Sequence, residues 1–312
     1  MTVVIGAEHM AGADRLVRVI DALAEAFADL SAGTTVSPSR TIVEHGADRQ
    51  LLAGTAVWER RGVGSVKITT ITPDNADRGL PLIHGVVVLT DLATGRITAL
   101  LDGAELTAVR TGAVAGLATR LCAAEDAEEL ALIGAGVQAR ALVRAVSAVR
   151  PIRSVRVFSR TAERTEAFAE WVRETFGHSV TVFDTAKAAV ADAAVICTAT
   201  STSDSTPIVA ADWVAPGAHV NVIGGTNEHA VEIDPALLAS AFVAVEERAA
   251  AVEDAGEVRI ALAEGLIGET DLHELGTLVA GAAAGRTSVF RSVGLAIEDT
   301  AAAAALYEAS AG

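Results

Sequence analysis

Aromatic residues and cysteines are scarce in this sequence, and both shortages exclude classes of protein. Phe, Trp and Tyr make up 4% of the 312 residues, although 51% are hydrophobic. The apolar content consists mainly of Ala, Val, Leu and Gly, which favours helices packed on a parallel sheet over an all-β sandwich. Two cysteines, Cys122 and Cys197, do not make a disulfide framework in a chain of this length. We expect both to be buried apolar side chains.

Long apolar segments and positive charge are lacking too. No uninterrupted apolar run reaches the roughly 18 residues of a transmembrane helix. The first 30 residues carry charges at Glu8, Asp14 and Arg15, which predicts neither a signal nor a transit peptide. The formal net charge of −16 disfavours nucleic acid and membrane surfaces as partners. No group of His, Cys and carboxylates has metal-ligand spacing, so we expect a cytoplasmic protein that binds a small molecule and no metal.

The first part of the chain predicts one helix and then a set of strands. Residues 11–31 are an amphipathic helix, because apolar side chains recur there every three or four positions. Residues 41–101 look mostly like strands, with a hairpin turn at residues 91–95. A second helix is expected from about Thr107 to about Leu121.

From residue 128 the pattern changes to short apolar strands that alternate with helices. The alternation predicts a doubly wound parallel sheet, an α/β fold. We expect the last segment, residues 289–310, to be mainly helix and to return to the first domain. The expected strands are 130–133, 155–158, 180–183, 194–197, 219–223 and 242–245, and the expected helices are 137–149 and 162–176.

Gly134 and Gly136 open a loop between the first of these strands and its helix, in the pattern Gly-x-Gly-x-x-Ala that ends at Ala139. The first glycine makes the tight turn, the second lets the backbone approach a pyrophosphate, and the small third residue lets the helix pack close to the strand. The helix N-terminus, with Val137 and Gln138, offers N–H groups to the anion. The loop predicts a dinucleotide site; the alternative is a tight strand–helix turn without a ligand.

The residues after the second strand distinguish between the two nicotinamide dinucleotides. NAD sites usually place Asp or Glu there, to bond the ribose 2′-hydroxyl. This chain has Ser159, Arg160 and Thr161, with Arg164 one turn later. An arginine and two hydroxyls suit a 2′-phosphate. We therefore predict NADP(H) over NAD(H); the alternative is that Arg160 is a solvated surface residue.

Other cofactor contacts are expected at strand ends. Thr198 and Thr200 follow a strand, where nucleotides bind in open α/β sheets. Thr111 and Gly224 are further candidates. Ordinary strand-end hydrogen bonding is the alternative for the threonines.

Four segments, taken in order, resemble the ornithine cyclodeaminase/μ-crystallin family: residues 102–111, 134–139, 159–161 and 288–299. The family includes cyclodeaminases that convert ornithine to proline and ammonia, ketimine reductases, and alanine- or opine-type dehydrogenases. The resemblance implies a homodimer. It also implies that residues 1–120 and 288–312 form a smaller α+β domain for substrate binding and dimerisation, and that residues 121–287 form an inserted Rossmann domain.

Three cations of the first domain are candidate substrate ligands: Arg40, Lys67 and Arg110. A guanidinium grips a carboxylate through two parallel hydrogen bonds. The resemblance implies that Arg110 reaches the substrate carboxylate and the cofactor, that Lys67 lies near the reacting centre, and that Arg40 faces the substrate. It also implies that Ser292 lies in the segment closing over the nicotinamide. Lys67 is the candidate proton or hydrogen-bond donor, with a pKa lowered by the arginines; salt bridges or solvated heads are the alternatives.

Two departures separate this chain from the family's cyclodeaminases. Those enzymes resemble each other in carrying an aspartate after the glycine pair at 224–225, where this chain has Thr226, and a glutamate before a Met-Pro pair, where residues 50–55 have neither. Loss of ammonia and ring closure need a proton shuttle. We therefore predict an NADP(H)-dependent reductase of a ketimine or imino acid, equivalently an amino-acid dehydrogenase in reverse. Glu228 or His229 could replace the aspartate, which leaves an ornithine cyclodeaminase open; a non-catalytic nucleotide-binding relative is the third class.

Overall fold

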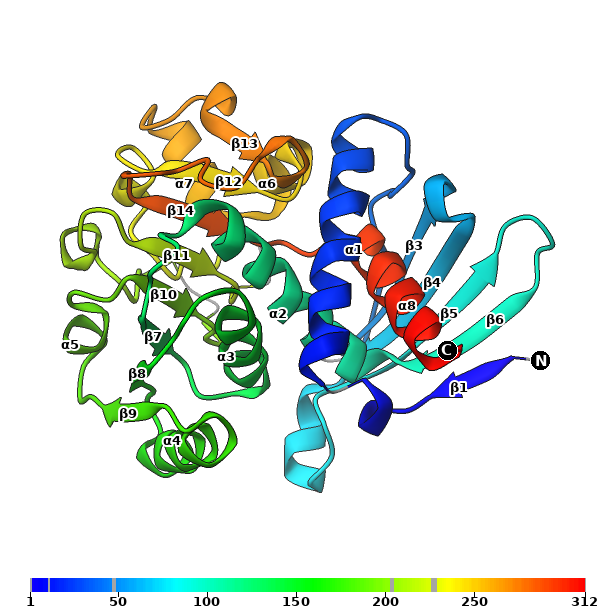
Figure 1. Cartoon of the computed structure of the whole chain (residues 1–312), viewed down its shortest axis with the longest axis horizontal. Helices are drawn as coiled ribbons and strands as arrows, with labels where there is room; N and C mark the ends of the chain where they lie inside the picture. Colours follow the sequence, from blue (N-terminus) through cyan, green and yellow to red (C-terminus); the bar gives the residue numbers. More distant parts are fainter. Residues whose placement is uncertain (1, 11, 47–48, 203–204, 226–228, 312) are drawn as a thin grey trace. The chain divides into compact units, whose positions relative to one another are not determined.

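The computed structural model describes residues 2–10, 12–46, 49–202, 205–225 and 229–311, and the chain divides into two compact units (Figure 1). Unit 1 combines Met1–Arg110 with Gly294–Gly312, and unit 2 is Thr111–Val293. The expected boundaries at 120/121 and 287/288 are therefore displaced. Residues 111–120 and 288–293 belong to unit 2, because a helix runs through the first boundary and a strand of the unit 2 sheet precedes the second.

Unit 1 is a six-stranded sheet with two long helices. Its strand order is β1-β6-β5-β4-β3-β2, in which β1 and β6 are parallel and all other neighbours are antiparallel. The elements are β1 (Val3–Ile5), α1 (Ala13–Ser31), β2 (Thr41–His45), β3 (Arg49–Trp58), β4 (Val63–Ile71), β5 (Ile83–Asp91), β6 (Ile97–Asp102) and α8 (Ala296–Ala311), with 3-10 turns at Ala7–His9, Glu59–Arg61 and Pro73–Arg78.

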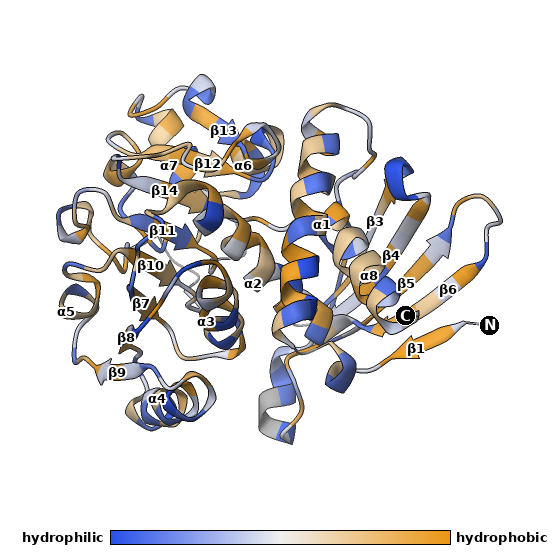
Figure 2. Ribbon diagram, in the orientation of Figure 1, coloured by the Kyte–Doolittle hydropathy of each residue, from blue (hydrophilic) through white to orange (hydrophobic). Residues whose placement is uncertain are grey.

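The two faces of this sheet differ in what covers them. Helix α1 alternates hydrophobic and hydrophilic positions along its length (Figure 2) and packs on α8, which lies on β3, β4 and β5. Because side chains alternate along a strand, Ser65, Lys67 and Thr69 share one face and are covered, while Val66 and Ile68 point the other way. An apolar row continues on that second face, which we call the open face, and its members are 36% to 75% exposed: Val4, Val43, Leu51, Val66 and Ile68.

Unit 2 is an eight-stranded, wholly parallel sheet with strand order β13-β12-β14-β11-β10-β7-β8-β9. The doubly wound α/β fold predicted from the sequence is confirmed. Its elements are β7 (Glu129–Ile133), α3 (Val137–Val149), β8 (Ser154–Phe158), α4 (Ala162–Phe176), β9 (Ser179–Val182), α5 (Ala186–Val190), β10 (Val195–Thr198), β11 (His219–Val222), β12 (Phe242–Val245), α6 (Arg248–Asp254), α7 (Gly256–Ala263), β13 (Leu272–Glu274) and β14 (Ser288–Arg291), with 3-10 turns at Ala211–Trp213, Pro235–Leu237, Glu269–Asp271 and Leu275–Thr277.

Two expected helices begin at other residues than predicted. Helix α2 (Gly103–Cys122) starts four residues before Thr107, because the Asp102 carboxylate accepts a hydrogen bond from the Glu105 N–H at 2.8 Å and caps the first turn. The segment 289–310, expected to be mainly helix, is helical from Ala296, but residues 289–291 belong to β14, a fully buried strand between β11 and β12. Within the described residues, no helix is both long and apolar enough to cross a bilayer.

The strand order of unit 2 reverses between β7 and β10. From β7 the chain steps outward through β8 and β9, then returns to place β10 on the other side of β7. Ile133 and Thr198, the last residues of the two strands, are register partners. The loops that follow them therefore meet at the carboxyl edge of the sheet, which is where open α/β sheets bind their ligands.

Candidate active site

The glycine loop of unit 2 has the geometry of a pyrophosphate cradle. Gly134 has φ +117°, and its N–H donates to Phe158 O at 2.9 Å. A Cβ at this position would collide with the carbonyl oxygen of Ala199, so only glycine fits between β7 and β10. A Cβ on Gly136 would meet no atom within 4 Å, and Ala139 is fully buried. The loop is thus closed toward the sheet and open where a pyrophosphate would approach.

The first turn of α3 also fits a bound anion. Gly136 is the N-cap residue and supplies no side-chain cap, so the first N–H groups of the helix are not satisfied by a capping side chain. Val137 is exposed. The buried Gln138 Oε1 has no hydrogen-bond partner in the described part of the chain. These residues fit the phosphates of a dinucleotide.

The segment after β8 presents polar side chains to solvent. Arg160, Thr161 and Arg164 are exposed and Ser159 is half-buried. Thr161 is the N-cap residue of α4, but its hydroxyl makes no capping hydrogen bond. The predicted 2′-phosphate ligands are therefore accessible.

The ends of β10 and β11 are tied together by a carboxylate that the sequence did not single out. Glu232 is fully buried. Its Oε2 accepts from the Thr198 hydroxyl and from the Gly224 N–H, each at 2.7 Å. Its Oε1 accepts from the N–H and the hydroxyl of Thr200, also at 2.7 Å. The Thr198 hydroxyl, predicted to contact cofactor, is directed inward to this carboxylate instead.

Two other predicted cofactor contacts are also buried. The Ser292 hydroxyl donates to Glu246 Oε1 at 2.6 Å, and the Val293 N–H donates to the other oxygen of the same carboxylate at 2.8 Å. Thr111, the first residue of unit 2, is 6% exposed. Ser292 and Thr111 are thus held within the fold, and their contact with a cofactor stays a prediction.

In unit 1, two of the three predicted cations are brought together by the start of α8. The Lys67 ammonium lies 2.8 Å from Asp299 Oδ2 and donates to Oδ1 at 2.9 Å. Arg110 Nη1 donates to Glu298 Oε2 at 2.8 Å, and its Nε lies 3.4 Å from Asp299 Oδ1. Both carboxylates are buried. We call Lys67, Arg110, Glu298 and Asp299 the charged cluster; its formal charges sum to zero.

Burial is the main influence on Lys67, and it lowers the pKa of the ammonium. Asp299 opposes this shift, Arg110 adds to it, and Glu298 opposes it more weakly. The expected direction is therefore right, but its main cause is desolvation. A lysine with this environment gives up its proton more readily than an exposed lysine does.

One glycine and one threonine complete the surroundings of the charged cluster. Gly294 has φ +79°, and a Cβ there would lie 2.9 Å from Arg110 Nη1, so glycine lets the guanidinium rest against the backbone. Thr69 lies on the same face of β4 as Lys67, and its buried hydroxyl has no hydrogen-bond partner among the described residues.

Arg40, the third predicted cation, is exposed and lies near the row of Lys67 in the strand register. It precedes Thr41, the partner of Ala53, and a Cβ on Gly54 would lie 4.0 Å from the Arg40 Cβ. Gly54 in turn pairs with Lys67. Arg40 therefore approaches the row of Lys67 across β3, which is compatible with the predicted role toward substrate.

Of the two possible replacements for the missing aspartate, Glu228 and His229, the structure describes His229. His229 is exposed. Thr226 and Glu228 lie outside the described residues.

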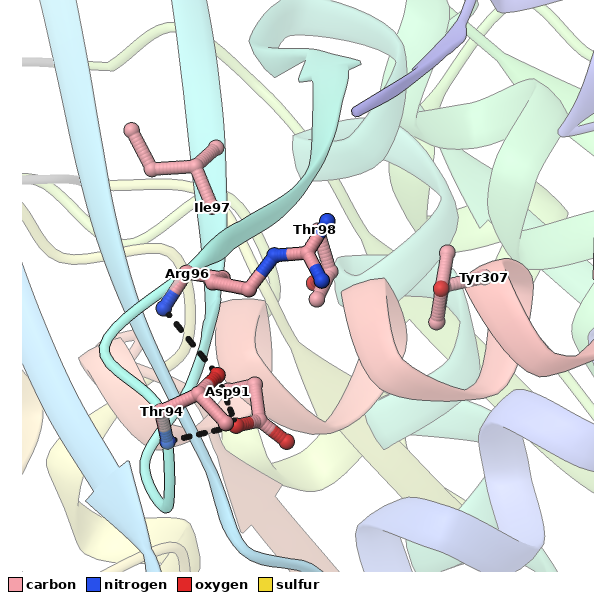
Figure 3. Close-up of a pocket in the computed structure, with 6 residues that line it drawn as sticks. All are labelled: Asp91, Thr94, Arg96, Ile97, Thr98 and Tyr307. Atoms are coloured by element: carbon pink, nitrogen blue, oxygen red, sulfur yellow. Dashed lines mark hydrogen bonds between the residues drawn. The ribbon is translucent and has the colours of Figure 1, made fainter. Parts of the chain in front are cut away.

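A separate pocket of about 310 Å³ lies at the far end of α8 from the charged cluster (Figure 3). It is formed by the β5–β6 hairpin and Tyr307, eight positions after Asp299. Within it, Asp91 Oδ1 accepts from the N–H and the hydroxyl of Thr94. These bonds stabilise the hairpin turn, so the pocket is explained by local structure.

A sequence model of the ornithine cyclodeaminase/mu-crystallin family matches residues 2–312. The chain belongs to this family. The resemblance inferred from four short segments is thereby confirmed over almost the whole sequence.

Several of the relatives are named as imine reductases. A Delta(1)-pyrroline-2-carboxylate reductase of Bacillus cereus is 37% identical over 298 residues, which cover 93% of this chain and 91% of that protein. Ketimine reductase mu-crystallin of Mus musculus is 30% identical over 305 residues, covering 96% and 94%. The structure of Thermococcus litoralis Delta(1)-pyrroline-2-carboxylate reductase in complex with NADH and L-proline matches with a TM-score of 0.90 and 30% identity, covering 99% of this chain and 98% of that one. These names agree with the predicted oxidoreductase more than with the cyclodeaminase alternative.

The carboxylates of the candidate site were not predicted from the sequence. Glu298 and Asp299 stood inside a matched segment, yet no role was given to them. Glu232 had a weaker signal: it is a lone charge among the apolar residues 230–233, just after a glycine pair. A charge in such surroundings indicates a buried, hydrogen-bonded group.

Proposed function

We propose that this protein is an NAD(P)H-dependent reductase of a cyclic ketimine carboxylate, of the class of Δ1-pyrroline-2-carboxylate. The charged cluster is the observation that carries the proposal, because it joins a guanidinium suited to a carboxylate with an ammonium suited to an imine. The named activities of the relatives support it. In the reaction the C=N carbon gains a hydride and the nitrogen a proton, while NAD(P)H becomes NAD(P)⁺.

Each residue of the charged cluster has a separate task. Arg110 binds the substrate carboxylate, and its contacts with Glu298 and Asp299 fix the plane of the guanidinium beforehand. Lys67 donates a hydrogen bond or a proton to the imine nitrogen. Asp299 favours the charged form of Lys67 and so opposes the effect of burial on its pKa. When bound, the reduced nicotinamide supplies the hydride.

We also propose that NADP(H) is the preferred cofactor. The support is the exposed group Ser159, Arg160, Thr161 and Arg164 after β8. A 2′-phosphate carries about two negative charges, which such a group pairs with. The solved relative contains NADH, so the ratio of activities with NADPH and NADH is the quantity to measure.

We propose a homodimer as the assembly, with the open face of the unit 1 sheet as the contact surface. Val4, Val43, Leu51, Val66 and Ile68 are exposed apolar side chains on that face. Groups of this kind mark interfaces in soluble proteins. Light scattering should give twice the chain mass for the wild type and one chain mass for Val66→Glu/Ile68→Glu, while Val279→Glu, on an exposed valine of unit 2, stays dimeric.

The test of function compares the only two lysines in the sequence, Lys67 and Lys187. NADPH and NADH oxidation is followed by absorbance with Δ1-pyrroline-2-carboxylate, and ornithine is assayed in parallel for free ammonia. We expect ketimine-dependent oxidation that falls about 100-fold or more in Lys67→Met and is unchanged in Lys187→Met, whose lysine is exposed on α5. Ammonia from ornithine without net oxidation would overturn the reductase. Undiminished turnover in Lys67→Met would remove the role of that lysine.

A further inference from the structure

A buried chain of three charged side chains lies behind the carboxyl edge of the unit 2 sheet. Glu232, Glu257 and Arg291 are each at most 1% exposed. The Glu232 N–H donates to Glu257 Oε1 at 2.7 Å, and Arg291 Nε donates to Glu257 Oε2 at 2.9 Å. Burying three charges is costly unless each is fully hydrogen-bonded. Their presence at one sheet edge therefore calls for an explanation beyond packing.

The chain of charges determines where the ends of three strands lie. Glu232 holds Thr198 and Thr200 after β10 and Gly224 after β11. Arg291, the last residue of β14, donates to Gly224 O at 3.0 Å and to Gly225 O at 2.7 Å. Gly224 has no room for a side chain, since a Cβ would collide with the Glu232 carboxylate and with Thr200 O. The loops after β10 and β11 are thus fixed on the sheet side by the same hydrogen-bond network.

The hydrogen bonds around Glu232 fit an ionised carboxylate. All four of its hydrogen bonds come from donors, two of them backbone N–H groups that cannot accept, and four donors saturate the two oxygens of a carboxylate. Burial raises the pKa of Glu232, and the bonds from Thr198 and Thr200 act against that rise. The two loops are therefore held by both oxygens of one side chain, each with two hydrogen bonds.

The loops held by Glu232 lie on the nicotinamide side of the candidate cofactor site. The pyrophosphate cradle follows β7, and the candidate 2′-phosphate ligands follow β8, on one side of it. β10 and β11 lie on the other side of β7 in the sheet order. A dinucleotide with its adenosine half toward β8 therefore has its other half at the carboxyl ends of β10 and β11.

We propose that Glu232 is a positioning residue for the nicotinamide half of the cofactor, acting through Thr198, Thr200 and Gly224 and itself fixed by Glu257 and Arg291. It touches neither the cofactor nor the reacting atoms. The inference rests on the proposed dinucleotide site of unit 2. It predicts that damage to Glu232 affects the nicotinamide end and leaves the adenosine end intact.

The first variant is Glu232→Gln. In either orientation of the amide, its NH₂ group faces the backbone N–H of Thr200 or of Gly224. Because two donors then face each other, one of the two loops is displaced. We expect kcat for ketimine reduction to fall by about 10- to 100-fold, as small misplacements of reacting groups do. The primary isotope effect with deuterated cofactor should rise, because hydride transfer becomes the slower step.

Binding separates positioning from general damage. The dissociation constant of the preferred dinucleotide should rise several-fold in Glu232→Gln. The dissociation constant of its ADP-ribose fragment should change less than about twofold, roughly 0.4 kcal/mol. The fragment carries the 2′-phosphate if NADP(H) is the preferred cofactor. This comparison does not require turnover. If the wild type binds the dinucleotide but reduces no ketimine, the proposed function fails and the proposal about Glu232 is still tested.

A milder pair of variants protects the test against misfolding. Thr198→Val removes one donor to Glu232. Thr119→Val makes the same change at an equally buried threonine of α2, whose hydroxyl donates to Ala115 O and accepts from Asn221 Nδ2. We expect Thr198→Val to lower kcat and raise the isotope effect, and Thr119→Val to do neither. Unchanged kcat and isotope effect in both Glu232→Gln and Thr198→Val would overturn the proposal. Equal loss of dinucleotide and fragment binding would overturn it as well and leave Glu232 a structural residue.

Discussion

At the scale of single residues, the site of unit 1 depends on pairs of opposite charges that set each other's protonation and orientation. Asp299 opposes the lowering of the Lys67 pKa that burial causes. Arg110 is aligned by two carboxylates and by the lack of a side chain at Gly294. Substitutions of the partners should therefore change the chemistry of Lys67 and Arg110 without removing either.

Asp299→Asn should shift the alkaline limb of the pH profile. If protonated Lys67 is required, kcat/KM falls as pH rises through its pKa. Loss of the Asp299 charge lowers that pKa further, so the limb should move to lower pH by about 1 to 3 units. The measurement is kcat/KM against pH for ketimine reduction. Glu308→Gln, at a half-exposed carboxylate on the same helix, serves as the control; a limb that stays in place in Asp299→Asn would contradict proton donation by Lys67.

Gly294→Ala should raise KM for the ketimine by about tenfold, because the new Cβ would displace the Arg110 guanidinium from its carboxylate-binding orientation. The positive φ adds a conformational cost of about 1 kcal/mol in stability. Gly95→Ala is a matched control in the same unit, since Gly95 has φ +70° and nothing within 4 Å of its Cβ position. Both variants should lose similar thermal stability, and an unchanged KM in Gly294→Ala would refute the link between this glycine and Arg110.

At the scale of elements, the strand–helix turns of unit 2 divide the proposed recognition of the cofactor. The β7–α3 turn suits the pyrophosphate that both dinucleotides share. The β8–α4 turn carries the exposed arginines that would distinguish them. Affinity and preference should therefore respond to different turns.

Arg160→Ala/Arg164→Ala should lower the ratio of kcat/KM for NADPH over NADH by about 10- to 100-fold, as expected for the loss of charge-assisted bonds of roughly 1.5 to 3 kcal/mol. The NADH value itself should change little. Arg153→Ala is the control, because that exposed arginine lies next to the amino end of the same strand and pairs with Glu128. A ratio unaffected by the double substitution would argue that the 2′-phosphate is not bound at this turn.

At the scale of the whole molecule, the larger unit contains a buried polar connection that is separate from the candidate site. His219 Nε2 donates a hydrogen bond to Asn221 Oδ1 at 3.2 Å, and its Nδ1 is hydrogen-bonded to the Ser288 hydroxyl at 2.8 Å. Asn221 donates to the Thr119 hydroxyl at 3.0 Å. The connection ties β11, β14 and α2 together, and burial lowers the pKa of His219 from 6.5 to about 4.

This histidine should make the protein sensitive to mild acid. Above pH 6.5 it is neutral in the folded and unfolded states, and its contribution to stability is complete. As pH falls from 6.5 toward 4, only the unfolded chain takes up the proton, so the free energy of unfolding should drop by about 1.4 kcal/mol per pH unit. Urea unfolding at pH 7, 6 and 5 measures the slope. The drop should shrink in His219→Gln and persist in His229→Gln, where an exposed histidine of the same unit is replaced; equal slopes in all three proteins would contradict this account.

Six strands and two helices of unit 2, the glycine loop and the identity of the cations were determined by the sequence itself. Each is a local pattern: apolar periodicity over a few residues, glycine spacing in a turn, or a charge in an otherwise acidic chain. The predicted helices at 137–149 and 162–176 agree with α3 and α4 to the residue. The family resemblance was local in the same sense, since it came from four short segments.

Only the tertiary structure determined which side chains work together. Lys67 meets Asp299 across 232 positions, and Arg110 meets Glu298 across 188. β14 is four residues long, and its strand character comes from pairing with β11 and β12. Glu232 looked like one acidic residue among many until folding placed four donors around it. Such partners depend on which strands become neighbours in a sheet, and hydrogen bonds between distant segments leave no periodic signal in the chain.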